Sequence, residues 1–283
     1  MKTNSNCLTI QKLEKRWAQN LFICVGLDSD YNKLPHKTGD IRKDLFEFNK
    51  AIIDATHDLV CAYKPNSAFY EAHGVLGWEA LKRTSLYIKK NYPEIPVLLD
   101  AKRGDIGNSN EGYTDSIFDE LQMDGVTVSP YLGEEALEPF LKRKDKLIIV
   151  LVKTSNPGAG EFQDLVVGGN NSHAKLYQYV ARQVADKWNK LGNLGVVMGA
   201  TYSKELKEVR EIAGQIPFLI PGLGAQGGEL EEVIKMGKDD RGWGMIINSS
   251  RSVIFASSGL DFAEAAREKV VEYNKIIKQI KAK

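Results

Sequence analysis

The chain has 283 residues, 43% of them hydrophobic, and carries 38 lysines and arginines against 37 aspartates and glutamates. A formal net charge of +1 gives no electrostatic reason to expect a nucleic acid or a membrane surface as partner. An anionic ligand would have to be met by a local group of charges, and the length fits one large domain or two small ones.

The first predicted element is a helix over residues 8–18, where charged and apolar residues alternate at helical spacing. A secretory signal peptide would instead carry a continuous apolar stretch before a small-residue cleavage site. No segment approaches the apolar run of about 20 residues that spans a membrane. We therefore expect a cytoplasmic location.

Eight short runs rich in Val, Ile and Leu follow along the chain. They cover residues 21–27, 59–64, 95–100, 125–129, 147–152, 194–198, 217–220 and 244–248. Most of these runs are apolar at nearly every position, which is typical of strands buried on both faces of a parallel sheet.

Amphipathic stretches of helical period separate the predicted strands. They cover residues 43–55, 75–90, 111–121, 174–191, 204–213 and 229–236, and residues 262–280 close the chain. Such alternation indicates right-handed βαβ units, and eight units in about 260 residues fit a closed barrel. We therefore predict an α/β fold, a (β/α)8 TIM barrel that forms one domain over residues 1–283, with the N-terminal helix capping the barrel bottom. An open doubly wound sheet fits the pattern less well.

The longest irregular segment covers residues 154–172, whose Gly, Pro and Asn content excludes a helix through most of it. Loops of this length in compact domains are usually lids or disordered segments, and we favour a lid.

The cysteines and histidines do not indicate a metal site. Cys7, Cys24 and Cys61 lack metal-ligand spacing, and the last two lie inside apolar runs, so we expect reduced thiols in the core. The four histidines include no H-x-x-x-H pair, so we expect no metal cofactor.

Polar residues gather where the predicted strands end, which is where barrel enzymes carry their catalytic groups. Asp28 ends the first strand, Lys64 the second, residues 100–105 the third and residues 153–155 the fifth. Any one of these residues alone could simply be a solvent-exposed residue at the end of a strand. A lysine at the end of an apolar strand is nevertheless costly to bury unless it is paired.

Four of these side chains carry opposite charges in equal number: Lys64, Asp100, Lys102 and Asp105. If they point toward one barrel mouth, they form a network that neutralises charge and fixes each side chain. Asp100 and Lys102 lie two residues apart and would face the same side of a regular strand. Carboxylates already in place suit the expulsion of CO2 from an anionic substrate, and a neighbouring lysine can donate the proton that replaces it.

A second group of residues has the composition of a phosphate site. Glycine-rich residues 221–228 follow the seventh strand, and residues 248–251 (Asn-Ser-Ser-Arg) follow the eighth, where barrels commonly bind phosphate. Arg251 can bind a phosphate through two hydrogen bonds. The spacing of Gly222, Gly224 and Gly227 also satisfies the dinucleotide pattern G-x-G-x-x-G, but the next strand ends without the acidic residue that would hold a ribose. A purely structural role, in which the glycines only turn the chain, remains open.

Residues 100–106 (DAKRGDI) match the D-x-K-x-x-D-I signature of the orotidine 5′-monophosphate decarboxylase family, and the surrounding LLDAKRGDIGNS resembles its longer bacterial branch. The resemblance extends along nearly the whole chain, through residues 26–28 (Gly-Leu-Asp), Lys64, residues 155–158 (Ser-x-Pro-Gly), residues 221–228 and residues 250–251 (Ser-Arg). It implies conversion of orotidine 5′-monophosphate to uridine 5′-monophosphate and CO2, the last step of de novo pyrimidine nucleotide synthesis. It also implies a homodimer with shared active sites and no metal or organic cofactor.

The resemblance assigns roles to individual residues. Lys64, Asp100, Lys102 and Asp105 would be the charge network, with Lys102 as proton donor and Asp105 reaching into the neighbouring subunit's site. Ile106 and Ser109 would complete that shared site, although the family commonly has threonine at the second position. By the same resemblance, Asp28 and Lys64 would hold the ribose, and Ser155 and Pro221 would contact the pyrimidine. Gln226 and Arg251 would bind the phosphate. Ser250 would also contact the substrate.

Two segments exceed what compact family members carry: residues 154–172 and the linker over residues 28–43. Two other functions also remain in view. A magnesium-dependent sugar-phosphate lyase or aldolase would share the D-x-K-x-x-D signature, but Lys64 would repel the cation. A non-catalytic barrel that binds a phosphate ligand would need no Lys102.

Overall fold

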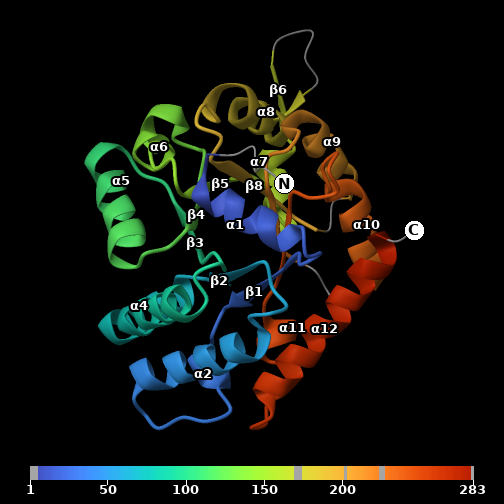
Figure 1. The fold of residues 1–283 in the computed structure, drawn as a ribbon. Coiled ribbons are helices and arrows are strands. Elements are labelled where there is room, and N and C mark those ends of the chain that lie inside the picture. Colours follow the sequence, from blue (N-terminus) through green and yellow to red (C-terminus); the bar gives the residue numbers. More distant parts are fainter. Residues whose placement is uncertain (1–5, 169–173, 201–202, 223–226, 282–283) are drawn as a thin grey trace.

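Eight parallel strands form one ring in the computed structural model, which describes residues 6–168, 174–200, 203–222 and 227–281 (Figure 1). The strands are β1 (Ile23–Leu27), β2 (Ala62–Pro65), β3 (Leu98–Arg103), β4 (Gly125–Val128), β5 (Leu147–Lys153), β8 (Leu194–Met198), β9 (Phe218–Ile220) and β10 (Met245–Ser249). Their order is β2-β1-β10-β9-β8-β5-β4-β3, and the ends of this order meet through isolated bridges of Tyr63 with Val97 and of Asn66 with Asp100. The predicted TIM barrel is confirmed.

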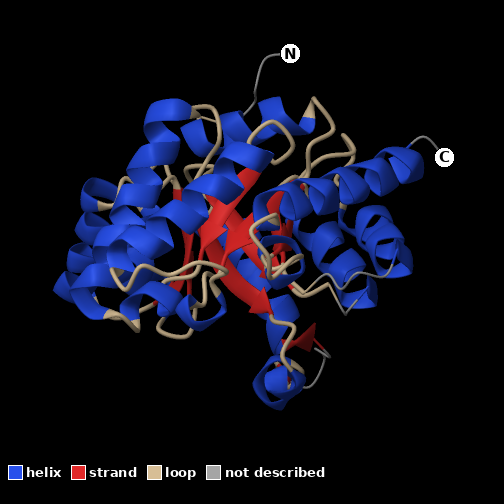
Figure 2. Ribbon diagram, turned by 90° about the horizontal axis from the view of Figure 1, so that it is seen from below, coloured by secondary structure: helices blue, strands red, loops and turns tan. Residues whose placement is uncertain are grey.

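Helices surround the ring of strands (Figure 2). They are α1 (Leu8–Trp17), α2 (Ile41–Thr56), α3 (Ala68–Glu71), α4 (Gly74–Asn91), α5 (Gly107–Thr114), α6 (Gly133–Leu141), α7 (Gly160–Gln163), α8 (Leu176–Arg182), α9 (Ser203–Ala213), α10 (Gly227–Gly237), α11 (Arg251–Ile254) and α12 (Phe262–Lys281). Short 3-10 turns occur at η1 (Tyr31–Lys33) and η3 (Pro157–Ala159), while α5 and α8 continue into the π-helical turns η2 (Asp115–Glu120) and η4 (Gln183–Trp188).

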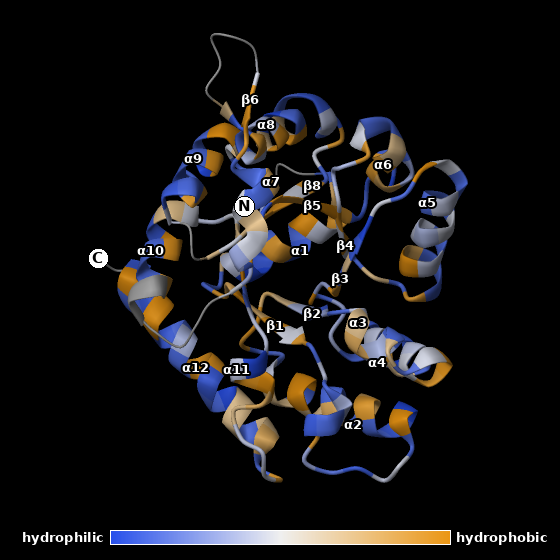
Figure 3. Cartoon of the chain, turned by 180° about the vertical axis from the view of Figure 1, so that it is seen from behind, coloured by the Kyte–Doolittle hydropathy of each residue, from blue (hydrophilic) through white to orange (hydrophobic). Residues whose placement is uncertain are grey.

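The outer helices are amphipathic, as their sequence period predicts, with polar and apolar residues alternating along them (Figure 3). On α12 the buried residues are Ala266, Val270, Tyr273, Asn274 and Ile277, a spacing that puts them on one face. The sequence did not predict α6, α3 or α11. Helix α6 is short and contains Pro139, so its periodic signal is weak.

Helix α1 crosses the end of the barrel where the strands begin. The Thr9 hydroxyl donates to the backbone oxygen of Asp124, just before β4, at 2.8 Å, and the Arg16 guanidinium donates to that of Val60, before β2, at 2.8 Å. Lys12 Nζ lies 3.2 Å from a carboxylate oxygen of Asp124. The prediction that the N-terminal helix caps the barrel bottom is therefore confirmed.

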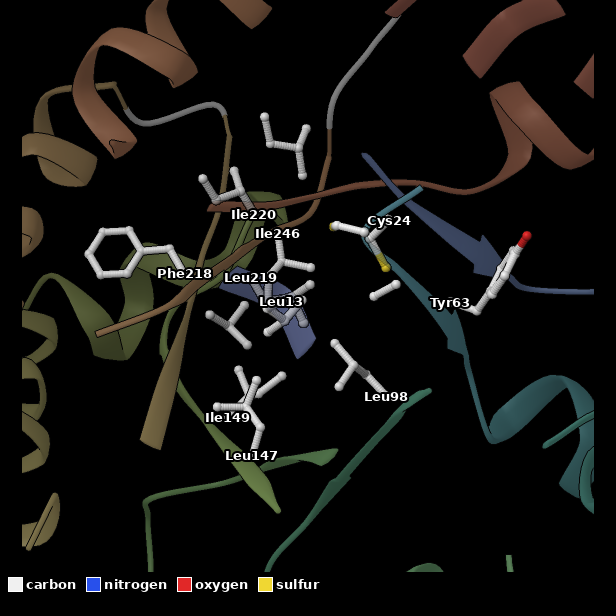
Figure 4. Close-up of a cluster of buried hydrophobic side chains, with 14 of the residues drawn as sticks. Leu13, Cys24, Tyr63, Leu98, Leu147, Ile149, Phe218, Leu219, Ile220 and Ile246 are labelled. Carbon is white, nitrogen blue, oxygen red and sulfur yellow. The ribbon is translucent and has the colours of Figure 1, made fainter. Parts of the chain in front are cut away.

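Large and small side chains share the barrel interior. A Cβ on Gly125 would lie 2.8 Å from the side chain of Leu98, and one on Gly195 would lie 3.4 Å from the side chain of Leu147, so glycines make room for the leucines. Leu13 of α1 joins this group from below, and Cys24 of β1 also points into it (Figure 4). The interior is a packed core in its lower part, which leaves the upper end for the polar residues.

The segment expected to be a lid contains more regular structure than its composition indicated. After η3 and α7, strand β6 (Val166–Val167) pairs antiparallel with β7 (Ala174–Lys175). Residues 169–173 lie outside the described part of the chain. None of the helices that the structure describes has the length and apolar character needed to span a membrane.

Candidate active site

Four predicted residues meet at the C-terminal mouth of the barrel. Lys64 Nζ lies 3.0 Å from Asp100 Oδ2 and 3.9 Å from Asp28 Oδ1. Lys102 Nζ lies 2.6 Å from the other oxygen of Asp100. Asp100 thus stands between two ammonium groups, one buried with 3% of its side chain exposed and one half exposed.

Charge and burial oppose each other in this group. Burial favours the neutral forms of both Asp100 and Lys64. For Asp100, the neighbouring charges of Lys64 and Lys102 outweigh burial and lower the pKa of the carboxyl below its ordinary value. For Lys64, the carboxylates of Asp100 and Asp28 likewise outweigh burial and raise the pKa of the ammonium. Both groups are therefore charged at neutral pH.

Strand β3 is irregular where it carries these residues. Its register with β4 passes from Leu99 opposite Val126 to Arg103 opposite Val128, so residues 100–102 bulge. Lys102 has φ +49°, which is the left-handed conformation that residues with a Cβ seldom adopt. We expected Asp100 and Lys102 to share a face because they would sit on a regular strand, and this reason was wrong, since the strand is irregular there. The bulge still leaves their charged groups in contact.

Asp105 does not join the ion pairs of its own chain. Its Oδ1 accepts a hydrogen bond from the Ile106 backbone N–H at 2.7 Å, and the described residues place no cationic group within ion-pair distance of it. Ile106 is 60% exposed, and Ser109 is also exposed. These three predicted residues thus line the rim of the barrel rather than the interior of this chain's mouth.

Ser155 follows β5 and fits between two glycines of neighbouring strands. A Cβ on Gly199 would lie 3.0 Å from the Ser155 backbone, and one on Gly222 would lie 3.3 Å from the Ser155 side chain. Pro221 directly precedes Gly222, and its backbone oxygen accepts a hydrogen bond from Ala200 at 3.0 Å. The structure therefore brings Ser155 and the segment of Pro221 and Gly222 together at the ends of β5, β8 and β9.

The predicted phosphate residues lie partly within the described chain. Ser250 follows β10, Arg251 is the exposed first residue of α11, and Gln226 lies outside the described residues. A Cβ on Gly26 of β1 would come within 1.9 Å of Ser250 Oγ, so the glycine allows Ser250 to pack over the end of β1. Helix α10 begins at Gly227, two residues earlier than predicted.

Two buried oxygens at the mouth have no hydrogen-bond partner among the residues that the structure describes. They are Oδ1 of Asp28, which is the oxygen 3.9 Å from Lys64, and Oδ1 of Asn248 near the end of β10. Asn248 Nδ2 donates to Ser250 Oγ at 3.3 Å. Buried acceptors are normally satisfied, so these two atoms are free to bind the hydroxyl groups of a ligand.

Sequence reasoning missed Thr127, which lies opposite the bulge of β3. Its Oγ1 donates to Asp100 Oδ1 at 3.0 Å and accepts hydrogen bonds from the backbone of Ala101 and Lys102. The signal was a single hydroxyl inside the apolar run Gly125–Val128. Asn248 was read only as part of a phosphate motif.

The arrangement suits loss of CO2 from a bound carboxylate better than binding of a metal ion. Lysines occupy both oxygens of Asp100, and the described residues contain no group of three or more His, Cys, Asp or Glu side chains that could hold a metal ion. A substrate carboxylate placed here would meet Asp100, while Lys102 offers a proton to the atom that the carboxylate leaves.

Comparisons with known proteins identify the family of the chain. Residues 22–268 match the family model described as "Orotidine 5'-phosphate decarboxylase / HUMPS family". The chain is similar to the orotidine 5'-phosphate decarboxylase of Flavobacterium johnsoniae, with 45% identity over 96% of this chain and 98% of that protein. It is also similar to the orotidine 5'-phosphate decarboxylase of Cellvibrio japonicus, with 48% identity over 91% of this chain and 93% of that protein.

A solved structure shares the fold over nearly the same length. The OMP decarboxylase of Leishmania donovani superposes with a TM-score of 0.81 and 37% identity, covering 95% of this chain and 98% of its own. Sequence and structure comparisons thus agree over nearly the whole chain, and the chain belongs to the orotidine 5'-phosphate decarboxylase / HUMPS family.

Proposed function

We propose that this protein decarboxylates orotidine 5′-monophosphate to uridine 5′-monophosphate and CO2, the last step of de novo pyrimidine nucleotide synthesis. It is a carbon–carbon lyase, as its family and its relatives named orotidine 5'-phosphate decarboxylase indicate. The observation that carries the proposal is Asp100 held between Lys64 and Lys102 at 3.0 and 2.6 Å, because decarboxylation needs a fixed anion beside the leaving group and a cation beside the carbon.

In the proposed reaction the bond between the pyrimidine carbon and the carboxylate breaks, and CO2 leaves. The electron pair stays on the carbon and takes a proton from Lys102 Nζ, which later regains one from solvent. Asp100 disfavours the bound carboxylate and at the same time holds Lys102 in place. Lys64 and the unpartnered Oδ1 of Asp28 would hold the ribose hydroxyls.

Contacts far from the reacting carbon would hold the substrate against this repulsion. Ser155 and Pro221 would contact the pyrimidine, while Gln226, Ser250 and Arg251 would bind the phosphate. Binding energy from the phosphate can then be used at the ring. A substrate that lacks the phosphate should therefore lose turnover as well as affinity, and equal turnover at saturation would contradict this assignment.

The direct test follows the ultraviolet absorbance of orotidine 5′-monophosphate with purified protein in the presence of EDTA. We expect full turnover, because the proposed chemistry uses only side chains. A flat trace would favour the magnesium-dependent sugar-phosphate lyase or aldolase. The Lys102→Ala variant distinguishes the decarboxylase from a non-catalytic phosphate-binding barrel. The decarboxylase should lose its activity when this amine is removed, whereas the non-catalytic barrel should keep its function of binding the ligand.

The proposal includes a homodimer in which Asp105, Ile106 and Ser109 act in the partner's site. Support comes from the exposure of apolar side chains after three neighbouring strands: Val75 and Leu76 after β2, Ile106 after β3, and Tyr131 and Leu132 after β4. Exposed apolar side chains on neighbouring segments are typical of surfaces that become buried in an interface. Sedimentation should report a dimer, and Tyr131→Asp should shift it toward monomer and reduce activity.

We also propose that residues 1–283 form one domain and that the protein works in the cytoplasm. The single barrel core supports the first statement. Proteolysis that released a separately folded fragment would contradict it, and cell fractionation tests the second.

A further inference from the structure

Thr127 on β4 is a buried threonine that contacts the bulge of β3, with 1% of the residue exposed. The register places three β3 residues, Asp100, Ala101 and Lys102, opposite this one β4 residue. In a regular parallel pair, backbone N–H groups that face the neighbouring strand donate to its carbonyl oxygens. A bulge breaks that pattern and leaves N–H groups to be satisfied in another way.

The hydroxyl of Thr127 takes the place of the missing carbonyl. The backbone N–H groups of Ala101 and Lys102 donate to Thr127 Oγ1 at 3.0 and 2.9 Å. A hydroxyl has two acceptor sites and one proton, so both acceptor sites are filled. Its proton must then point to Asp100 Oδ1, which lies 3.0 Å away.

One side chain thus touches both members of the reacting pair. Asp100 Oδ1 receives the Thr127 hydroxyl and the Lys102 ammonium, while Asp100 Oδ2 receives Lys64. The backbone of Lys102, with φ +49°, is fastened through its own N–H. Neither the left-handed backbone nor the carboxylate can move without breaking a bond to Thr127.

We infer that Thr127 is a positioning residue for decarboxylation, and that its hydroxyl sets the bulge that aligns Asp100 with Lys102. The activity test of this inference rests on the proposed function, but the geometry it describes does not. Thr127 acts at the reacting end of the site, away from the predicted phosphate residues after β9 and β10. Its removal should therefore change turnover more than binding.

The experiment compares Thr127→Val, which keeps the shape and removes the hydroxyl, with Thr127→Ser, which keeps the hydroxyl. We expect kcat of the valine variant to fall about 10- to 100-fold, because two partly buried N–H groups lose their acceptor and the Asp100 carboxylate loses one of its donors. Its KM and its affinity for uridine 5′-monophosphate should stay within about threefold of the wild type, the scatter expected where contacts to the ligand are retained. The serine variant should regain most of kcat.

Thr56→Val is the matched control. Thr56 is fully buried, and its Oγ1 donates to the Ile52 backbone oxygen at 2.7 Å and lies 2.8 Å from the Tyr63 hydroxyl, so both of its hydrogen-bond partners lie outside the group of Lys64, Asp100 and Lys102. It should lose stability comparably while keeping kcat. Equal kcat in wild type and Thr127→Val, or an equal loss in the serine and valine variants, would overturn the inference.

Two further readouts cover the remaining outcomes. If the valine variant does not fold, the serine variant decides alone, because a loss of kcat above about tenfold in a protein that keeps the hydroxyl contradicts the inference. If the wild type does not decarboxylate the substrate, the proposed function fails, and a crystal structure of Thr127→Val still tests the geometry. Unchanged distances from Asp100 to Lys64 and Lys102 would then overturn the positioning role.

Discussion

Lys64 and Asp100 form an ion pair across the mouth of the barrel, with Nζ 3.0 Å from Oδ2 and with 3% and 13% of the two side chains exposed. A buried ammonium of this kind depends on its carboxylate, and the carboxylate depends on the ammonium. A change to either residue should therefore affect both the stability of the fold and the rate of decarboxylation.

Replacing Lys64 with methionine keeps the volume of the side chain and removes its charge. We expect kcat/KM to fall at least about 100-fold, because Asp100 and Asp28 then face each other without the cation between them. The absorbance assay measures the loss. Lys50→Met, which breaks a partly exposed ion pair with Asp54 on α2, should leave kcat/KM unchanged. Equal values for Lys64→Met and Lys50→Met would contradict the role of Lys64.

The Asp100→Asn variant tests the electrostatic balance through pH. Because the two lysines lower the pKa of Asp100 below its ordinary value of 3.8, the ionised carboxylate stabilises the fold above that pH, and this stabilisation is lost as pH falls through the folded-state pKa. The variant should be less stable by about 3 kcal/mol near pH 7. Urea unfolding should show this difference shrinking below pH 4 or so. A difference that does not change with pH would show that the carboxylate gains nothing from its neighbours.

Gly26→Ala tests the contact between the end of β1 and the start of α11. The added Cβ would lie 2.8 Å from the Cβ of Ser250, so Ser250 and the adjoining Arg251 must move. We expect KM to rise about tenfold and kcat to fall by a smaller factor, since the phosphate contacts are disturbed and part of their binding energy is used at the ring. Gly112→Ala is the control, because a Cβ there meets nothing within 4 Å. A larger effect on kcat than on KM would place Gly26 at the reacting end.

Lys153→Met tests how the segment after β5 is held. Lys153 Nζ is fully buried and lies 2.8 Å from Asp164, and the Gln163 amide bonds to the backbone and hydroxyl of Thr154. Loss of the ion pair should make local opening about tenfold more frequent, seen as faster proteolysis within residues 154–164. The free energy of unfolding should change by less than about 2 kcal/mol, because Asp164 keeps Lys175 at 3.3 Å.

The matched control for that variant is Lys190→Met, whose ion pair with Glu134 is largely exposed. It should leave the cleavage rate of the segment unchanged. Identical proteolysis of wild type and Lys153→Met would mean that the segment is held by its other contacts.

The eight strands were predictable because they are buried on both faces and need apolar residues at nearly every position. The polar strand ends were predictable for the converse reason, since Lys64 has no place in a core without a partner. Helix α6 was not, because Pro139 and its short length leave too little periodic signal.

The bulge of β3 could not be predicted from residues 100–102 alone. It depends on a hydroxyl of Thr127, about 25 residues away, which supplies the acceptor that the strand lacks. The ion pair of Lys153 with Asp164 could not be predicted either, because Asp164 lies in a segment with no periodic pattern. Local pattern indicates which residues are buried, but tertiary contacts decide which polar groups meet.

Strands β2 and β3 are joined only by isolated bridges among the described residues, and Lys64 and Asp100 lie on opposite sides of that joint. We expect local opening of the barrel to occur first at the joint with the fewest hydrogen bonds. Each such fluctuation separates the ammonium from the carboxylate and exposes the amides of Tyr63 and Ser67, which donate across the same joint, to deuterium. A nucleotide that contacts Lys64 on one side of this joint and Lys102 on the other would therefore slow isotope exchange at those two amides before any chemistry takes place.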